Sequence, residues 1–326
     1  MGEAHARCYA ALQQAHLAAV CDINHQRCDE IARRYSTEAV YDFTDLDGRV
    51  DAVSVALPTV LHAEASQFFL ERGVSVLVEK PMARSSAEAA ALVDAAAESG
   101  ATLMVGHIER FNPAFMAIRQ LELKPLFIEC DRISPFRFRS ADVGVVFDLM
   151  IHDIDIILSL ACSEVDQVDA CGVAVLGANE DICNARLLFE NGCVANITAS
   201  RVATKSMRKI RLFSHDSYIT IDYAARQALI YRKSPKLTLD TAKTLKSGAT
   251  SLADFAGMSF PELLDIKDVE LDDHEPLAKE LEAFVSAVES GTPPPVSGRE
   301  GMEAVRVAER VIQAVNVHRK LVESRH

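Results

Sequence analysis

The sequence lacks any apolar run near the roughly 18 residues that a membrane span needs, and its eight cysteines include no C-x-x-C pair. The first residues mix Glu3, His5 and Arg7, unlike the charged and then apolar pattern of a secretory signal. Scattered cysteines in apolar stretches are typical of reduced, buried thiols. We therefore expect a cytoplasmic protein with no membrane association and no metal site.

Basic residues are few: 34 Lys and Arg stand against 47 Asp and Glu, for a net charge of −13. This balance argues against a general nucleic-acid surface, so we expect no nucleic acid among the partners. The 326 residues are enough for two domains with full cores.

Two glycines and a strand are missing at the N-terminus. Gly2-Glu3-Ala4-His5 resembles the end of a G-x-G-x-x-G dinucleotide-binding fingerprint, and Asp22 stands where an acidic residue would bind the adenosine ribose. Loss of a central strand would remove on the order of 10 kcal/mol of burial free energy. We therefore expect about ten more residues upstream in the natural protein, by analogy with the fingerprint. The alternative is a protein that has given up its phosphate-binding loop.

Apolar strands alternate with helical patterns over the first hundred residues. The predicted strands are 17–21, 52–57, 74–78 and 101–105, and the predicted helices are 3–14, 24–35, 60–72 and 85–99. Near-continuous apolar strands separated by helices indicate a parallel sheet covered on both faces. We predict an α/β fold whose residues 1–108 form a Rossmann-like, doubly wound domain without its first strand.

Residues 109–326 are predicted to form an α+β domain with an open, mainly antiparallel sheet. Asn191-Gly192 is a strong hairpin signal between strands at 185–189 and 194–198. Further strands are expected at 125–134, 165–176, 208–214, 217–223 and 227–232, with a helix over 149–161. Residues 234–272 suggest an irregular excursion, and helices at 276–290 and 298–322 are expected to pack back onto the body.

Two clusters could carry chemistry. Glu79-Lys80-Pro81 follows a predicted parallel strand, at the edge where open α/β sheets bind ligands. Asp148 and His152 are four residues apart, one helical turn on the same face, so the carboxylate could orient the imidazole as a general base. Alternatively, Lys80 is a surface lysine, and Asp148 caps a helix beside a structural histidine.

The segment Gly106–Pro113 joins the two predicted domains. Its Asn112-Pro113 predicts a helix start, with asparagine as the cap and proline in the first turn. His107 and Arg110 could serve either function or interdomain packing.

An ordered set of motifs now points to a family. The set is Met1-Gly2-x-x-His5, Asp22, Leu57-Pro58-Thr59-x-x-His62, Glu79-Lys80-Pro81, Gly106-His107-x-x-Arg110-Phe111 and Asp148-x-x-x-His152. With it the chain resembles, from end to end, the glucose-fructose oxidoreductase/inositol dehydrogenase/MocA (Gfo/Idh/MocA) family of NAD(P)-dependent sugar dehydrogenases.

The resemblance implies roles for individual residues. Lys80 would hydrogen-bond the reacting hydroxyl, His152 would take its proton, and Asp148 would hold His152. A carboxylate at Asp22 would favour NAD and disfavour the 2′-phosphate of NADP. The implied cofactor-binding residues are Gly2, His5, Asp22, Leu57, Pro58, Thr59, His62, Glu79, Lys80, His107 and Arg110.

Within the family, the segments around His107 and His152 are most similar to the UDP-N-acetylglucosamine 3-dehydrogenase branch, which makes a 3-keto sugar for amino-sugar synthesis in lipid A. The implied substrate-binding residues are Lys80, Asn112, Arg137, Arg139, His152 and Arg201. Other cations that could meet a diphosphate are Arg132, Lys205, Arg208, Lys209 and Arg211. The alternatives are a dehydrogenase of a free sugar or polyol such as inositol, and a non-catalytic regulator with a truncated nucleotide site. The family also implies a homodimer or homotetramer.

Overall fold

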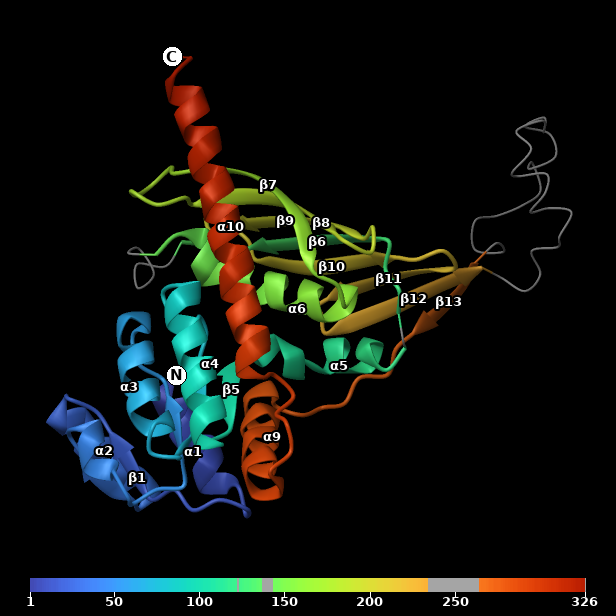
Figure 1. The fold of residues 1–326 in the computed structure, drawn as a ribbon. Coiled ribbons are helices and arrows are strands. Elements are labelled where there is room, and N and C mark those ends of the chain that lie inside the picture. Colours follow the sequence, from blue (N-terminus) through green and yellow to red (C-terminus); the bar gives the residue numbers. More distant parts are fainter. Residues whose placement is uncertain (122, 137–142, 234–263, 326) are drawn as a thin grey trace, which may run out of the picture.

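The computed structural model describes residues 1–121, 123–136, 143–233 and 264–325. Parallel strands and their helices lie at one end of the molecule, and a broad sheet lies at the other (Figure 1). The long helix α10 (Gly298–Glu323) runs past both regions and contacts β7, α4 and α6. The expected α/β fold class is confirmed.

The parallel strands form two separate pieces. One contains β1 (Ala19–Cys21) and β2 (Glu38–Val40); the other has the order β3 (Ala52–Val55), β4 (Ser75–Glu79), β5 (Leu103–Gly106). In the Rossmann strand order, the first strand separates the second from the fourth. No strand of the described residues occupies that position between β1 and β3. The sheet is therefore divided where the motif analysis found a strand missing.

Two of the four α-helices of this region begin at a side-chain cap. The α-helices are α1 (Gly2–Ala11), α2 (His25–Tyr35), α3 (His62–Leu70) and α4 (Ser86–Ser99). The side chain of Asn24 caps α2, and that of Ser85 caps α4, each accepting a backbone N–H three residues on. Gly100 then ends α4 in the left-handed conformation that glycine adopts without strain. The predicted helix over 60–72 is shorter because Thr59–Leu61 form a separate 3₁₀ turn.

The large sheet has eight strands in the order β13-β12-β11-β10-β6-β9-β8-β7. All neighbours are antiparallel except β6 and β9, which confirms an open, mainly antiparallel sheet. The strands are β6 (Phe127–Ile133), β7 (Val165–Val173), β8 (Ile182–Phe189), β9 (Val194–Ser200), β10 (Met207–Phe213), β11 (Ser217–Asp222), β12 (Gln227–Lys233) and β13 (Leu264–Asp268). The Asn191-Gly192 turn joins β8 to β9, with Gly192 at φ +84°.

Strand β13 corrects the prediction that 234–272 are irregular. Its five residues pair with β12, and four of them are exposed. Because an exposed edge strand buries little apolar surface, its sequence carries no clear strand pattern. The remainder of that predicted excursion, 234–263, lies outside the described residues.

Helices cover one face of the large sheet and join it to the parallel strands. The helix α6 (Ile151–Ala161) packs on β6, whereas α9 (Pro276–Ser290) contacts α1 and the 3₁₀ turn η3 (Ile108–Phe111). A capping box between Ser297 and Glu300 starts α10. Asn112 caps α5 (Pro113–Arg119) with proline in the first turn, as predicted.

None of the helices in the described ranges is both long and apolar enough to cross a membrane.

Candidate active site

The carboxyl ends of β4 and β5 position the first part of the site. Glu79 ends β4, and its carboxylate lies 2.9 Å from Nε2 of His5 on α1. A Cβ on Gly106, the last residue of β5, would lie 3.3 Å from Cα of Glu79. The glycine thus allows the two strand ends to approach closely, and Lys80 leaves the sheet directly after this contact.

His62 connects the two neighbouring strand ends. Its Nδ1 lies 2.9 Å from the carbonyl oxygen of Pro81, and its Nε2 lies 2.8 Å from that of Leu57. The imidazole is buried, so these contacts hold the segments after β3 and β4 together. This geometry explains why the Leu57-Pro58-Thr59 motif continues to a histidine.

Lys80 reaches the segment that carries Asp148. Its Nζ donates a 2.7 Å hydrogen bond to the backbone oxygen of Asp148 and lies 4.0 Å from the Oδ1 of the same residue. The Lys80 side chain is 18% exposed. It is therefore a positioned, mostly buried cation rather than a solvated surface lysine.

Asp148 and His152 lie on different kinds of helical turn. Residues Val146–Met150 form a single π-helical turn, and regular α-helix begins only at Ile151. A π-helix closes i to i+5 hydrogen bonds, so a four-residue spacing there is not the one-turn spacing of an α-helix. Within the described residues, no hydrogen bond joins the Asp148 carboxylate to His152, and that carboxylate lies 4.0 Å from the Nζ of Lys80. The expected role of Asp148 in holding His152 stays a prediction.

His152 and His107 lie close together. Their rings have centroids 6.5 Å apart in an edge-to-face arrangement. Burial, followed by the positive charges of Lys80 and Arg132, holds the pKa of His152 well below its usual value, and burial also lowers the pKa of His107. Nδ1 of each ring is buried without a partner among the described residues. Both imidazoles are therefore neutral at physiological pH, the state a general base requires.

A buried ion cluster beneath His152 was missed by the sequence analysis. Arg132 on β6 donates two 2.8 Å hydrogen bonds to Asp153 and one of 2.9 Å to Glu109. This arrangement corrects the idea that Arg132 faces a diphosphate, because two carboxylates already engage its guanidinium. The signal was present in β6, where Ile128, Cys130 and Arg132 alternate inward.

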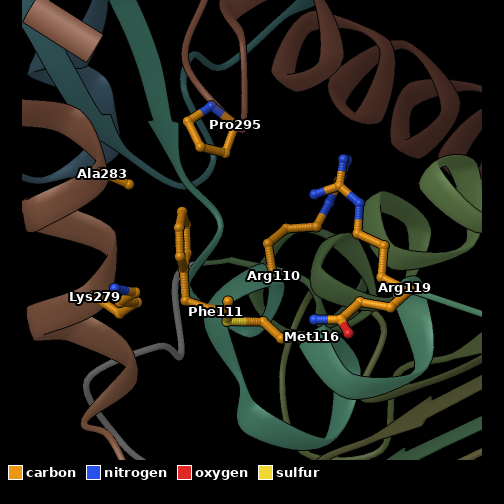
Figure 2. A pocket seen from close by; sticks show the side chains of 8 residues that line it. Arg110, Phe111, Met116, Arg119, Lys279, Ala283 and Pro295 are labelled. Atoms are coloured by element: carbon orange, nitrogen blue, oxygen red, sulfur yellow. The ribbon is translucent and has the colours of Figure 1, made fainter. Parts of the chain in front are cut away.

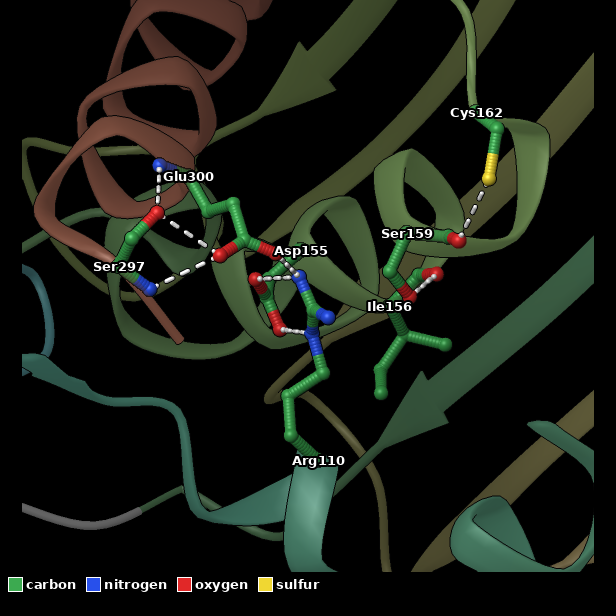
Figure 3. A network of polar contacts seen from close by, with 7 residues as sticks. All are labelled: Arg110, Asp155, Ile156, Ser159, Cys162, Ser297 and Glu300. Atoms are coloured by element: carbon green, nitrogen blue, oxygen red, sulfur yellow. Dashed lines mark hydrogen bonds and ion pairs between the residues drawn. The ribbon is translucent and has the colours of Figure 1, made fainter. Parts of the chain in front are cut away.

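Arg110 is held in a second buried network (Figure 3). Its Nε and Nη2 donate to the carboxylate of Asp155 at 2.7 and 2.9 Å, and Nη2 also lies 3.2 Å from Glu300 on α10. The network joins the segment after β5 to α6 and α10. Interdomain packing, one of the two open interpretations, is therefore supported, and the cofactor contact of Arg110 stays a prediction.

The remaining expected substrate residues occupy different surroundings. Arg201 is buried, donating from Nε to Asp181 at 2.7 Å and from Nη1 to the carbonyl oxygen of Val143 at 2.6 Å. Asn112 uses its side chain to cap α5. Arg137 and Arg139 lie outside the described residues. Arg208 is 47% exposed, pairs with Arg132 across β10 and β6, and forms a 3.7 Å ion pair with Glu109.

The surface around Asp22 fits the adenosine end of NAD. Asp22 directly follows β1 and is half-buried, and its Oδ1 accepts the backbone N–H of Asn24 at 2.9 Å. Two exposed apolar side chains, Ile23 and Leu57, lie shortly after the ends of β1 and β3. A Cβ on Gly2 would meet nothing within 4 Å, so the start of α1 is open to a ligand. These residues would hold the ribose and line the adenine.

The chain matches known families over most of its length. Residues 1–107 match the Gfo/Idh/MocA oxidoreductase family with an NAD-binding Rossmann fold, and residues 128–219 match the Gfo/Idh/MocA C-terminal domain. UDP-N-acetylglucosamine 3-dehydrogenase from Acidithiobacillus ferrooxidans is 34% identical, covering 97% of this chain and 94% of its own. A solved structure of that protein superimposes with a TM-score of 0.85 at 32% identity, covering 97% of this chain and 95% of the other.

More distant relatives share the fold. Inositol 2-dehydrogenase from Rhizobium meliloti is 25% identical over 98% of this chain and 96% of its own. Levoglucosan dehydrogenase, solved in complex with NADH, has a TM-score of 0.80 at 19% identity, covering 97% of this chain and 94% of the other. The chain therefore belongs to the Gfo/Idh/MocA family of oxidoreductases, with an NAD-binding Rossmann domain at its N-terminal side, as the motifs predicted.

Proposed function

We propose that this protein oxidises a secondary hydroxyl of a nucleotide sugar to a ketone, and that the substrate is UDP-N-acetylglucosamine, oxidised at its 3-hydroxyl. The observation that carries the proposal is the hydrogen bond from Lys80 to the backbone oxygen of Asp148, in the turn that leads directly into His152. The positive charge of Lys80 is also one cause of the lowered pKa of His152, after burial. A hydrogen-bond donor and a proton acceptor therefore face one small region at the carboxyl edge of the sheet.

The chain's own groups supply the proton chemistry. When bound, NAD supplies an acceptor for the hydride that leaves the sugar carbon. Lys80 donates a hydrogen bond to the reacting oxygen and orients it. His152 accepts the hydroxyl proton at Nε2, because its Nδ1 is buried. The C–H and O–H bonds break, a C=O bond forms, and the new imidazolium lies beside Lys80, which favours prompt release of its proton.

The choice of a UDP sugar rests on two supports. The A. ferrooxidans relative with that activity is 34% identical across nearly the whole chain. Arg208 adds an exposed cation beside Arg132 in the large sheet; it is 3.7 Å from Glu109, and a diphosphate would offer it a further charge-assisted contact. A keto sugar of this kind is the substrate that an aminotransferase needs, in keeping with a role in lipid A-type amino-sugar synthesis.

The proposal is tested by NADH formation with UDP-N-acetylglucosamine and with free inositol. We expect turnover of the UDP sugar, lost by at least 10²-fold in His152→Ala because a positioned base contributes about that much. Arg208→Met is expected to raise KM for the UDP sugar and to leave NAD affinity unchanged. NADH formation with inositol alone would favour the polyol activity named for the R. meliloti relative.

A folded, NAD-binding protein that turns over neither substrate would instead support a non-catalytic regulator. We further propose a cytoplasmic homodimer or homotetramer with a domain boundary near residue 108. Light scattering measures the oligomeric state directly.

A further inference from the structure

A cavity of about 470 Å³ lies apart from Lys80 and His152, between α5, α9 and the segment after β5 (Figure 2). Its volume is within the ~300–1,000 Å³ range of small-molecule sites. Neither Lys80, His107 nor His152 lines it. The lining residues are Arg110, Phe111, Met116, Arg119, Gln120, Lys279, Ala283 and Pro295.

The charges around this cavity have one sign. Three lining residues are cations, Arg110, Arg119 and Lys279, and no lining residue is acidic. In Figure 2, Arg110 and Arg119 lie on the side of the cavity opposite α9, which carries Lys279. Lys279 is paired on its own helix with Glu282 at 2.8 Å. Arg110 is paired with Asp155 and Glu300, so Arg119 contributes the larger uncompensated charge among the lining residues.

Arg110 supplies an independent sign of a ligand. Its residue is only 3% exposed, yet Nη1 is buried and has no hydrogen-bond partner in the part of the chain that the structure describes. Leaving a buried N–H of a charged group without an acceptor is unfavourable, so native structures normally provide one. Asp155 and Glu300 satisfy only the Nε and Nη2 of this guanidinium.

Arg119 is the second arginine of this cavity. It ends α5 and is exposed, and no ion pair or hydrogen bond joins its guanidinium to another described residue. Guanidinium groups bind carboxylates and phosphates through paired N–H donors. Two guanidinium groups among the lining residues therefore favour a small anion with more than one oxygen.

The rest of the lining is apolar. Phe111, Met116, Ala283 and Pro295 contribute an aromatic ring, a thioether and aliphatic carbon. Such a surface gains free energy by covering an apolar body. We propose that this cavity binds a small molecule with an aromatic or apolar body and a single carboxylate or phosphate, which Arg110 and Arg119 would hold.

The test is a binding measurement on the full-length protein with three probes that share a 4-bromophenyl ring: 4-bromobenzoate, 4-bromophenyl phosphate and neutral 4-bromobenzyl alcohol. Calorimetric titration should show saturable binding of at least one anion and at least about tenfold weaker binding of the alcohol, the size expected for one charge-assisted hydrogen bond. A crystal soaked in 4-bromobenzoate should show anomalous bromine signal between Phe111 and Ala283.

Two variants locate the site without touching the buried Asp155 network. Arg119→Met should weaken anion binding by about tenfold, and Ala283→Leu should weaken all three probes by filling the cavity. Arg319→Met, an exposed arginine of α10 that does not line the cavity, should leave every affinity unchanged. Absence of anion binding at millimolar concentration, or equal binding by the wild type and both pocket variants, would overturn the proposal.

Discussion

Lys80 is bound to the backbone of Asp148 rather than only to its carboxylate: Nζ donates to the carbonyl oxygen at 2.7 Å, while the carboxylate Oδ1 is 4.0 Å away. A backbone acceptor cannot be removed by a side-chain substitution. The position of the ammonium is therefore tied to the π-helical turn Val146–Met150 and less to the charge of residue 148.

Lys80→Met is expected to lower kcat by at least about 10²-fold, because the hydrogen bond to the reacting oxygen is lost while the length of the side chain is kept. Steady-state NADH formation with UDP-N-acetylglucosamine measures the effect. Lys279→Met provides the control, since that lysine is paired with Glu282 away from the site. Near-normal kcat in the Lys80 variant would remove its assigned role.

Asp148→Asn is expected to cost less than about tenfold in kcat, because the backbone bond to Lys80 remains and no hydrogen bond of the described residues joins Asp148 to His152. Its kcat is compared with that of His152→Ala under the same conditions. A loss as large as that of His152→Ala would show that the carboxylate orients the base after all, by a rearrangement when substrate binds.

His152 is expected to make stability depend on pH. Its pKa is lowered in the folded protein, so the unfolded chain binds a proton more readily. The contribution of His152 to the free energy of unfolding is fully present above the pKa of histidine in the unfolded chain, near ~6.5. It is lost as the pH falls toward the pKa of the folded protein, and the free energy of unfolding then changes by at most ~1.4 kcal/mol per pH unit. Urea unfolding between about pH 7.5 and pH 5 measures this slope.

The change in the free energy of unfolding per pH unit should decrease in His152→Asn. It should stay unchanged in His16→Asn, which replaces an exposed imidazole. The apparent pKa of the acid limb in the pH profile of kcat/KM should likewise lie below ~6.5, since the free enzyme keeps a neutral base to lower pH. An apparent pKa above that value would contradict the burial of His152.

Asp22→Ser is expected to raise kcat/KM with NADP by at least about tenfold and to lower it with NAD, because a carboxylate at this strand end repels a 2′-phosphate and binds the ribose hydroxyls. Parallel assays with both cofactors measure the ratio. Asp29→Ser on α2 serves as the acidic control. An unchanged ratio would place the ribose elsewhere.

Arg132→Met is expected to destabilise the fold by ~3–5 kcal/mol, since Asp153 and Glu109 would keep buried negative charge without their partner. Arg34→Met is the matched control, because its bridges to Glu3 and Glu30 are exposed and such pairs contribute ~0–1 kcal/mol. Chemical denaturation of both variants gives the difference. Similar losses of unfolding free energy in Arg132→Met and Arg34→Met would mean that the buried cluster contributes no more stability than the exposed ion pairs.

Local signals were enough for several features of this protein. The strand ends that carry Asp22 and Lys80, the Asn112-Pro113 helix start and the Asn191-Gly192 hairpin each depend on neighbouring residues, and the structure contains all of them. The ordered motifs also identified the family.

Contacts between distant residues were decided only by the tertiary structure. No hydrogen bond of the described residues joins Asp148 to His152, and Arg110 pairs with Asp155 and Glu300, which are 45 and 190 residues away in the chain. Neither result follows from periodicity, since a buried charge takes whichever partner the packing brings within reach. The sequence alone thus determined which residues occupy the edge of the sheet. The packing of α6, α9 and α10 decided what those residues touch.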